Sequence, residues 1–462
     1  MKKNKYTKQT TIKVERKVDN VIYYTILGLL IGLPLMQLIR MSIAGSGNLG
    51  LYYSFHCGYL LWLCIPVLLV CYLMIIFKYK EKIGIIDIVC YLLVLMGLLS
   101  SVNAIDIKTA FIGSFDRYEG FLTNLSYVLI LLSLIRLSSK RKCLVLLNLF
   151  ICLGIFQSFY AFGQVFLRGG LFLSFIFPYM ANALCGNPNF LGSYLLLTSL
   201  LSIYLGIYSN QYKKFYITSG IINSIGLVLA QSTIPFLSYV IGLGLIFIYT
   251  IVKHKSLLKR CIWILVANLL VSLIMVYVSV PIVTDVHKDV VIPNYTIRDD
   301  LSQIYYFFFN DGKKPSENPF VPSVQPETTF YAGRVYIWKN TLKIVKDNIL
   351  LGIGYDNLGE LFYQENNLYI DKAHNHYLNI LVSNGIFSLI AYLVLFTTII
   401  IKGIRSKQLL PNLIAFSIIA FMIHYFFSTS VLEVTPYFLM VCSIIFVFDK
   451  SQDDKDLIFV KE

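Results

Sequence analysis

Apolar residues recur along this chain in long runs that are separated by short polar connections. A helix needs about 20 predominantly apolar residues to cross the hydrocarbon core of a bilayer, and runs near that length follow one another over most of the sequence. The pattern therefore predicts an all-α fold, a polytopic helical membrane protein with about 12 transmembrane helices. The predicted spans are residues 21–38, 55–77, 85–104, 120–137, 143–166, 186–207, 216–231, 233–252, 260–280, 377–401, 411–429 and 433–448.

These spans divide the chain into three regions. Residues 1–280 are expected to form an N-terminal transmembrane bundle of about nine spans, and residues 281–376 a large extracytoplasmic loop. Residues 377–462 are expected to form the C-terminal spans and a cytoplasmic tail. Turn-forming residues are frequent at 284–332, so this part of the loop is predicted to be irregular, with a short helix near 301–309.

The segment at 334–347 has the pattern of an amphipathic helix. Four apolar residues recur at helical spacing on one face, and lysines occupy the opposite face. The apolar four are Val335, Trp338, Leu342 and Val345. Such a helix fits either of two positions, flat on the membrane surface or as a cap on the bundle.

Composition agrees with a membrane protein. Of the 462 residues, 57% are hydrophobic and 14% are charged, whereas soluble domains contain about 25% charged residues. The nine cysteines form no C-x-x-C pair, so we interpret them as small buried hydrophobic side chains. The first apolar run lacks a small-residue cleavage site and is interpreted as a retained anchor.

The distribution of positive charge predicts the orientation in the membrane. If the N-terminus is cytoplasmic, the inner segments contain 26 lysines and arginines, whereas the short outer connections contain four: Arg40, Lys108, Arg117 and Arg168. Cytoplasmic loops carry an excess of positive charge. We therefore predict a multi-pass protein of the cytoplasmic (inner) membrane with both termini in the cytoplasm. The net charge of +14 follows this topology and does not indicate nucleic-acid binding.

The polar stretch from Gly333 to Gly385 carries the residues best suited to chemistry. Its motifs, in chain order, are Arg334, Trp338, LLGIGYDNL at 350–358, His374-Asn375 and Gly385. This combination resembles the O-antigen ligase family of bacterial membrane glycosyltransferases, which includes lipopolysaccharide ligases, polysaccharide polymerases and O-linked oligosaccharyltransferases. Two further segments resemble motifs common in such proteins, SFDRYEGFLT at 114–123 and GNPNFLGSYL at 186–195.

The resemblance implies a glycosyltransferase with its active site on the extracytoplasmic face. It would transfer a lipid-diphosphate-linked oligosaccharide or polysaccharide, of the undecaprenyl type, to an acceptor hydroxyl. The acceptor is a glycan, a lipid-linked sugar or a protein, and a polymerase or ligase is favoured over protein glycosylation. The acidic residues of the outer loop match no metal-ligand spacing, so a metal-independent enzyme without a cofactor is expected. Membrane lipids are the other implied partners.

Two positions depart from the family pattern. The family often carries Ser-Arg-Gly near the start of a middle span, with the arginine implicated in holding pyrophosphate, whereas this chain has Gln-Ser-Thr at 231–233. A second cation for the donor would then come from another loop, and Arg117 and Arg168 are the two candidates. Ser388 stands where many members carry a glycine.

The chemistry of two residues fits the implied reaction. The leaving diphosphate gains negative charge in the transition state, and the planar guanidinium of Arg334 can bind its oxygens with two hydrogen bonds. A histidine such as His374, with an ordinary pKa of about 6.5, can take the proton of the acceptor hydroxyl. We therefore expect both to be catalytic. A cation at His374 that steadies the leaving group is the other possibility considered.

Four further residues are expected to bind substrate on the strength of the resemblance: Arg117, Trp338, Asn375 and Asn187. Several of the candidate residues also have a simpler interpretation that involves no substrate. Arg334 also fits a lipid headgroup contact, His374 an interfacial hydrogen bond, and Trp338 an interfacial anchor. Arg117 lies between Asp116 and Glu119 and could be paired with them in a surface loop. His376 is expected to have a supporting role, and His424, inside an apolar run, requires a polar partner.

A rival function is a transporter, such as a flippase for lipid-linked oligosaccharides. About twelve spans would fit it, but the chain shows no two repeated halves, and its polar residues concentrate in one outer segment. A non-catalytic partner in export or assembly is a third reading.

Overall fold

The computed structural model describes residues 16–45, 56–115, 117–167, 180–286, 296–298, 300–301 and 330–449. Within these residues the chain is all-helical, as predicted, and contains no strand. Arg168 and residues 302–309, which carry two sequence-based expectations, lie outside the described residues. The helices are α1 (Lys17–Gly45), α3 (Gly58–Leu73), α4 (Ile85–Val102), α5 (Ile107–Ile112), α6 (Phe121–Leu134), α7 (Lys140–Phe162), α8 (Pro188–Tyr208), α9 (Lys213–Leu229), α10 (Thr233–Lys253), α11 (Leu258–Val286), α13 (Phe330–Asp347), α14 (Leu358–Asn366), α15 (His376–Arg405), α16 (Leu409–Tyr425) and α17 (Thr435–Asp449).

Short pieces of other helix types extend or join these elements. The π-helices η1 (Met74–Lys78) and η2 (Gly163–Leu167) continue α3 and α7, and the 3₁₀-helices η4 (Ala183–Cys185) and η5 (Lys255–Leu257) precede α8 and α11. With these extensions, eight helical segments of the described chain are long and apolar enough to cross a membrane. They contain α1, α3, α4, α7, α8, α10, α11 and α15. The protein is therefore a helical membrane protein.

Each of the twelve predicted spans coincides with a helix. The remaining four are short: α6, α16 and α17 are apolar helices of 10–17 residues, and α9 has 17 residues. The number of helices that cross the membrane beyond the eight stays a prediction.

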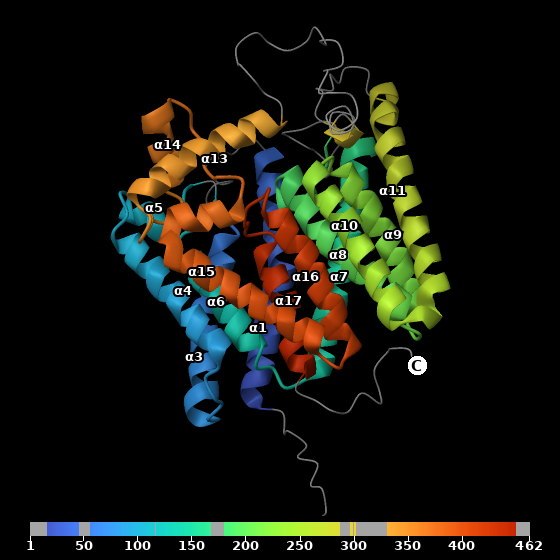
Figure 1. Cartoon of the computed structure of the whole chain (residues 1–462), viewed down its shortest axis with the longest axis horizontal. Coiled ribbons are helices and arrows are strands. Elements are labelled where there is room, and N and C mark those ends of the chain that lie inside the picture. The colour runs from blue at the N-terminus through green and yellow to red at the C-terminus, as the bar shows by residue number, and fades with distance from the viewer. Residues whose placement is uncertain are drawn as a thin grey trace, which may run out of the picture.

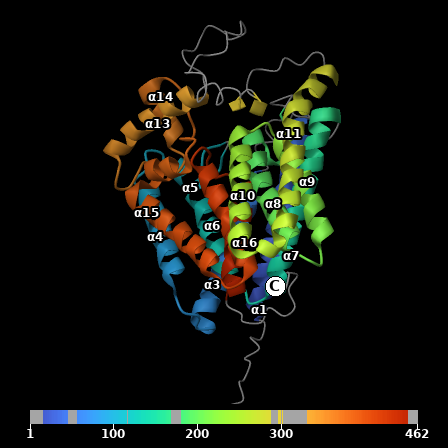
Figure 2. The same cartoon turned by 45° about the vertical axis from the view of Figure 1, so that its right-hand side comes forward.

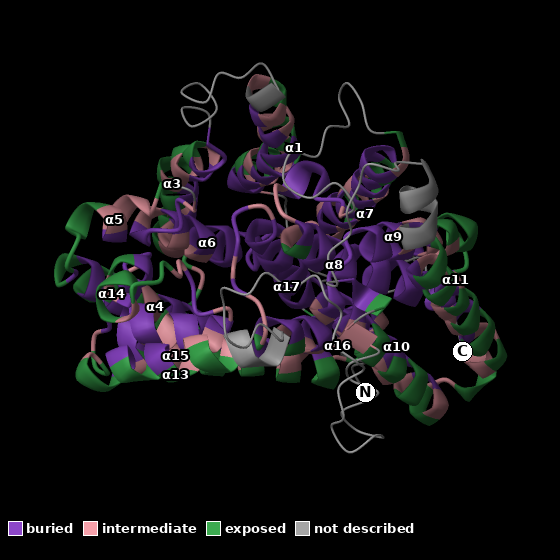
Figure 3. Ribbon diagram, turned by 90° about the horizontal axis from the view of Figure 1, so that it is seen from above, coloured by how far each residue is buried: buried purple, intermediate pink, exposed green. Residues whose placement is uncertain are grey.

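Helix α8 forms the centre of the bundle. It contacts α7, α9, α10, α11 and α16, and nearly all of its residues are buried (Figure 3). A helix that is apolar on every face is stable when protein or lipid surrounds it on all sides, and α8 is surrounded by other helices. Outer helices such as α11 instead keep exposed apolar residues on one side, including Trp263 and Tyr277, as expected for helices that face lipid.

The loops predicted to be cytoplasmic meet at one end of the bundle. Arg16 contacts Glu81 at 2.8 Å, and Arg136 contacts Asp87 at 2.5 Å. Helices α5, α13 and α14 lie at the opposite end (Figures 1 and 2). This arrangement follows the predicted alternation of loops between two sides. Which end faces the cytoplasm stays a prediction.

Helix α13 caps the bundle across this second end, next to α14 and α15 (Figure 1). Its buried face agrees only in part with the expected one. Val345 and Trp338 belong to or pack against a small hydrophobic core with residues of α14 and α15, whereas Val335 and Leu342 are exposed (58% and 52%). Ile344, which was not among the four predicted residues, is buried in this core.

Helix α15 is broken at Gly385, and the segment after α13 fills the break. Gly385 has a positive φ of 78°. The amides of Ile353 and Gly354 donate to the carbonyls of Val382 and Ser383, both at 2.9 Å. A Cβ at Gly352 would lie 2.4 Å from the carbonyl carbon of Ser383. The Gly-x-Gly pattern is therefore required for the backbone to approach the broken helix this closely.

Candidate active site

The segment Asp371–His376 is the centre of the candidate site, between α14 and α15. Successive side chains along it bind different parts of the protein, as described below. His374 has a φ of 49°, a left-handed conformation that is uncommon for a residue with a side chain. Such backbone outliers occur often at functional sites.

Two neighbouring residues of this segment form crossed ion pairs with the loop before α6. The carboxylate of Asp371 accepts from Arg117 Nε at 2.6 Å, and Lys372 Nζ lies 3.2 Å from Glu119 Oε2. Each loop therefore supplies one cation and one anion to the other. This pairing holds together segments that are more than 250 residues apart in sequence.

Lys372 has a second anionic partner, Asp356, in the turn after the Gly-x-Gly motif. Its Nζ lies 2.5 Å from Asp356 Oδ1, and both side chains are almost fully buried. Asp356 Oδ2 accepts from the amides of Ser114 and Glu119 at 3.0 and 3.2 Å. Burial alone would lower the pKa of Lys372, but Asp356 and Glu119 raise it above its ordinary value. The cluster is therefore charged and joins three loops.

Burial raises the pKa of Glu119, and Lys372 opposes this shift. Burial also favours the neutral form of Asp371, yet the charge of Arg117 holds the pKa of Asp371 below its ordinary value. Arg117 in turn packs its guanidinium 5.2 Å from the ring centre of Phe190, in the first turn of α8. Arg117 is therefore paired with Asp371, a partner other than the two considered from sequence, of which Asp116 lies outside the described residues.

Arg334 binds the backbone on either side of the site. Its Nη1 donates to the carbonyl of His374 at 3.2 Å and also to the carbonyl of Phe427, in the connection between α16 and α17. Burial lowers the pKa of Arg334 to about 10, and Asp300 opposes this shift. The guanidinium therefore stays charged at neutral pH. It lies beside His374, as the predicted pairing of these two residues requires.

His374 is neutral at physiological pH. Burial, and then the positive charge of Arg334, lower its pKa to about 4. This pKa is lower than the ordinary value of about 6.5 expected from sequence, because the side chain is buried. The imidazole forms no hydrogen bond within the described part of the chain. A neutral imidazole has one unprotonated ring nitrogen and can therefore accept a proton.

Trp338 and Asn375 position this segment. The indole Nε1 of Trp338 donates to the carbonyl of Ala373 at 3.0 Å, and its ring packs edge-on against Phe426. Asn375 is the N-cap of α15, and its side-chain oxygen accepts from the amide of Leu378 at 3.0 Å. These contacts hold both side chains in place beside His374, and their role in substrate binding stays a prediction.

Asn187 is the N-cap of α8 and accepts from the amide of Asn189 at 2.9 Å. It lies in the same turn as Phe190, on which Arg117 packs. Of the six predicted site residues, Arg334 and His374 are therefore in direct contact. Trp338 and Asn375 contact or adjoin the residues on either side of His374. Arg117 is joined to this segment by Asp371, and Asn187 lies at the start of α8, where Arg117 packs on Phe190.

His376 and His424 have partners that agree with the roles expected of them. His376 Nδ1 accepts from the amide of Ser430 at 3.3 Å, so it fixes the connection between α16 and α17. His424 Nε2 lies 2.7 Å from Ser193 Oγ, which is its required polar partner. No group of three or more His, Cys, Asp or Glu side chains that could hold a metal ion occurs among the residues that the structure describes.

Sequence reasoning did not identify the ion cluster. Asp356, Asp371 and Lys372 were not among the predicted site residues. A signal was present: Glu119 and Asp356 both lie inside segments singled out as motifs, DRYE and GYDN. Because both motifs are predicted to lie on the outer face, their charged residues could have been considered as partners of oppositely charged residues in the same loops.

The chain matches a family model over residues 218–393, and this family is described as O-antigen ligase. The matched region extends from α9 into α15 and contains Arg334, Trp338, the Gly-x-Gly motif, His374 and Gly385. The predicted resemblance is therefore confirmed for this region. No curated protein matches the chain.

Proposed function

We propose, taking the chain as a protein of the O-antigen ligase family, that it transfers a glycan from a lipid diphosphate to an acceptor hydroxyl. Arg334 and His374 carry the reaction at the outer face of the cytoplasmic membrane. The observation that carries this proposal is the hydrogen bond from Arg334 to the carbonyl of His374 at 3.2 Å. It places a permanent cation beside a neutral histidine, and these are the two groups that the reaction requires.

In the proposed reaction, the acceptor oxygen attacks the anomeric carbon of the donor sugar. The bond from that carbon to the diphosphate oxygen breaks, and the electron pair leaves with the diphosphate. Arg334 stabilises the charge that develops there. The proton of the acceptor hydroxyl moves to the unprotonated nitrogen of His374. Each bond formed is thus balanced by a bond broken, without a metal or a cofactor.

Arg117 is proposed as the second cation of the donor site. The stretch that matches the family's Ser-Arg-Gly is 231–234 here and contains no arginine, and the side-chain amide of Gln231 in it is bound to Ser279 and to the backbone of Ile297. A neutral amide cannot replace a cation. Arg117 is held by Asp371 beside the start of α8, and a donor diphosphate would share it with that carboxylate.

The acceptor is proposed to be a glycan or lipid-linked sugar, as in a polymerase or a ligase. Purified protein in lipid nanodiscs, supplied with a lipid-diphosphate-linked glycan, tests the proposal. Transfer predicts a longer or transferred glycan together with free lipid diphosphate. Movement of intact donor across a bilayer without these products would indicate a flippase. The absence of both, in folded protein that binds donor, would indicate a non-catalytic partner.

The side of the membrane can be tested independently. Pro315→Cys, in a chain whose nine native cysteines have been replaced, should react with an impermeant thiol reagent added outside intact cells. A cysteine at Arg405, in the predicted inner loop before α16, is the matched control and should react only after the membrane is opened. The reverse pattern would move the proposed site to the cytoplasmic face.

A further inference from the structure

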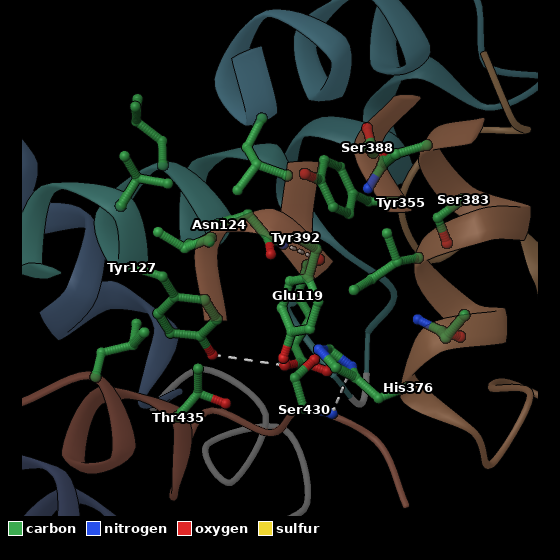
Figure 4. A pocket seen from close by; sticks show the side chains of 18 of the residues that line it. Glu119, Asn124, Tyr127, Tyr355, His376, Ser383, Ser388, Tyr392, Ser430 and Thr435 are labelled. Atoms are coloured by element: carbon green, nitrogen blue, oxygen red, sulfur yellow. Dashed lines mark hydrogen bonds between the residues drawn. The ribbon is translucent and has the colours of Figure 1, made fainter. Parts of the chain in front are cut away.

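A cavity of about 120 Å³ lies beneath the candidate site, between α4, α6, α15 and α17. Its lining changes character along the helices. Near the candidate site it is formed by polar groups such as Glu119 and His376 (Figure 4), together with Lys372. Farther along α6, α15 and α17 it is formed by Leu131, Phe396 and Leu439. We call this cavity the inner chamber.

Helix α15 places unpaired polar atoms in the chamber wall. Ser388 and Tyr392, four residues apart after the break at Gly385, share one side of the helix, and Asn384, just before the break, lines the same chamber. Asn384 Oδ1, Ser388 Oγ and Tyr392 Oη are buried and have no hydrogen-bond partner among the described residues. A buried polar atom without a partner costs about 1–3 kcal/mol. Three such atoms around one cavity indicate that it holds something with hydrogen-bonding groups.

The charge of the chamber restricts what this occupant can be. Among the lining residues the cation is Lys372, and two carboxylates, Glu119 and Asp356, already neutralise it. A diphosphate would therefore meet no available cation and two nearby anions. The rest of the lining is predominantly leucine, valine and aromatic side chains, which disfavours a purely aqueous filling. A neutral amphiphile needs no cation, and its apolar part suits the apolar lining.

We propose that the inner chamber binds an apolar chain that carries neutral oxygen atoms at its outer end. Asn384, Ser388 and Tyr392 would bind those oxygens, and the apolar end of the chamber would bind the chain. Two sources share this chemistry: the ester end of a membrane lipid and the sugar-bearing end of an uncharged glycolipid. The second source would be an acceptor substrate and so rests on the proposed function. The first does not.

The chamber is separate from the donor site but adjacent to it. Arg334 binds the carbonyl of His374, whereas Lys372 and His376, two residues to either side, line the chamber. His376 also contacts the ring of Tyr392, with 5.0 Å between ring centres. An occupant of the chamber would therefore touch the same short segment that carries His374.

Photo-crosslinking in nanodiscs tests this inference without any donor. The two probes are a diacylglycerol and a glucosyl diacylglycerol, each with a diazirine in one acyl chain. In the wild-type protein, peptides that contain Leu131 and Phe396 should be labelled by at least one probe. Labelling by both to the same extent would identify membrane lipid as the source, and preferential labelling by the glucosyl probe would identify a glycolipid.

Two variants and a control make the test specific. Ser388→Leu fills the chamber and should reduce the labelling of these peptides at least fivefold. Ile390→Leu, on the lipid-facing side of the same helix and 51% exposed, should leave it unchanged. Tyr392→Phe keeps the volume but removes one unpaired hydroxyl, and should reduce labelling about two- to fivefold without changing the thermal unfolding temperature by more than a few degrees.

The inference is overturned if wild-type labelling is confined to lipid-facing residues such as Leu393, or if chamber labelling persists in Ser388→Leu. It is also overturned if Tyr392→Phe raises stability with no change in labelling, since that is the behaviour of an empty chamber. Protein that is labelled in the chamber but transfers no glycan would contradict the proposed function and leave the chamber assignment intact.

Discussion

Arg334 donates a hydrogen bond to the backbone oxygen of His374, although 40 residues separate them in the chain. The contact is possible because α13 caps the bundle and the segment after it returns along the break in α15. It uses the backbone of His374, which leaves the imidazole available to a substrate. Together with burial, the guanidinium charge lowers the pKa of His374 and so keeps the imidazole neutral.

The first prediction concerns the buried ion cluster. Lys372→Met leaves two buried carboxylates without their cation and should destabilise the protein by about 3–5 kcal/mol. Lys402→Met is the matched control, because the Lys402–Asp449 pair is about one-third exposed and should contribute little. Thermal unfolding in detergent compares the two. Equal effects of the two changes would show that the cluster is not what joins the three loops.

A second prediction separates two roles of Arg117. Arg117→Lys keeps the charge but loses the fork that binds Asp371, and should reduce transfer at least tenfold if the fork also binds the donor. Asp371→Asn removes the pairing and leaves the guanidinium in place, so it should retain donor binding. Donor affinity measured for both variants distinguishes the roles. If Asp371→Asn loses as much affinity as Arg117→Lys, Arg117 acts only by holding the loop.

A third prediction concerns the break in α15. Gly385→Ala places a side chain at a φ of 78° and against the carbonyl of Leu350. We expect destabilisation of at least about 2 kcal/mol. Gly244→Ala in α10, where a Cβ meets nothing within 4 Å, should be neutral or stabilising. Unfolding temperatures of the two variants provide the comparison, and a tolerated Gly385→Ala would show that the break is dispensable.

The helices, and Arg334 and His374 as candidates for one site, could be predicted from sequence, because apolar runs and motif spacing are local signals. The partners of those residues could not. Asp371 and Lys372 are adjacent in sequence, yet Asp371 pairs with Arg117, whereas Lys372 pairs with Glu119 and with Asp356 in a different loop. Only the folded backbone determines which partner each one meets. The exposed face of α13 was missed for a similar reason. Val335 and Leu342 follow the same helical spacing as Trp338 and Val345, but the small core that α13 covers buries Ile344 with Val345 and leaves Val335 and Leu342 exposed.

A fourth prediction follows from the pKa of His374. Because the folded value of about 4 lies below the ordinary value of about 6.5, the imidazole stays neutral as the pH falls through 6. Transfer should therefore be nearly constant from about pH 8 to pH 5 and should decline only near pH 4. The rate of a single turnover over this range tests it. A half-maximal rate near pH 6.5 would contradict a desolvated histidine.

The same shift makes a prediction about stability. Between about pH 6.5 and pH 4 the unfolded chain binds a proton at this position and the folded chain does not, so folding stability should decrease as the pH falls through that window. His374→Gln removes this contribution. The difference in unfolding temperature between wild type and His374→Gln should therefore change between pH 7 and pH 4.5 and stay constant above pH 7.

The most direct test of the account compares Arg334→Ala with His374→Ala in donor binding and in single-turnover transfer. Arg334→Ala should weaken donor binding and slow transfer together, because the donor loses its cation. His374→Ala should bind donor as the wild type does and transfer glycan about 10²–10⁴-fold more slowly, because it lacks the base. Transfer by folded His374→Ala at the wild-type rate would contradict the central claim, and the family match would then indicate a shared fold without this mechanism.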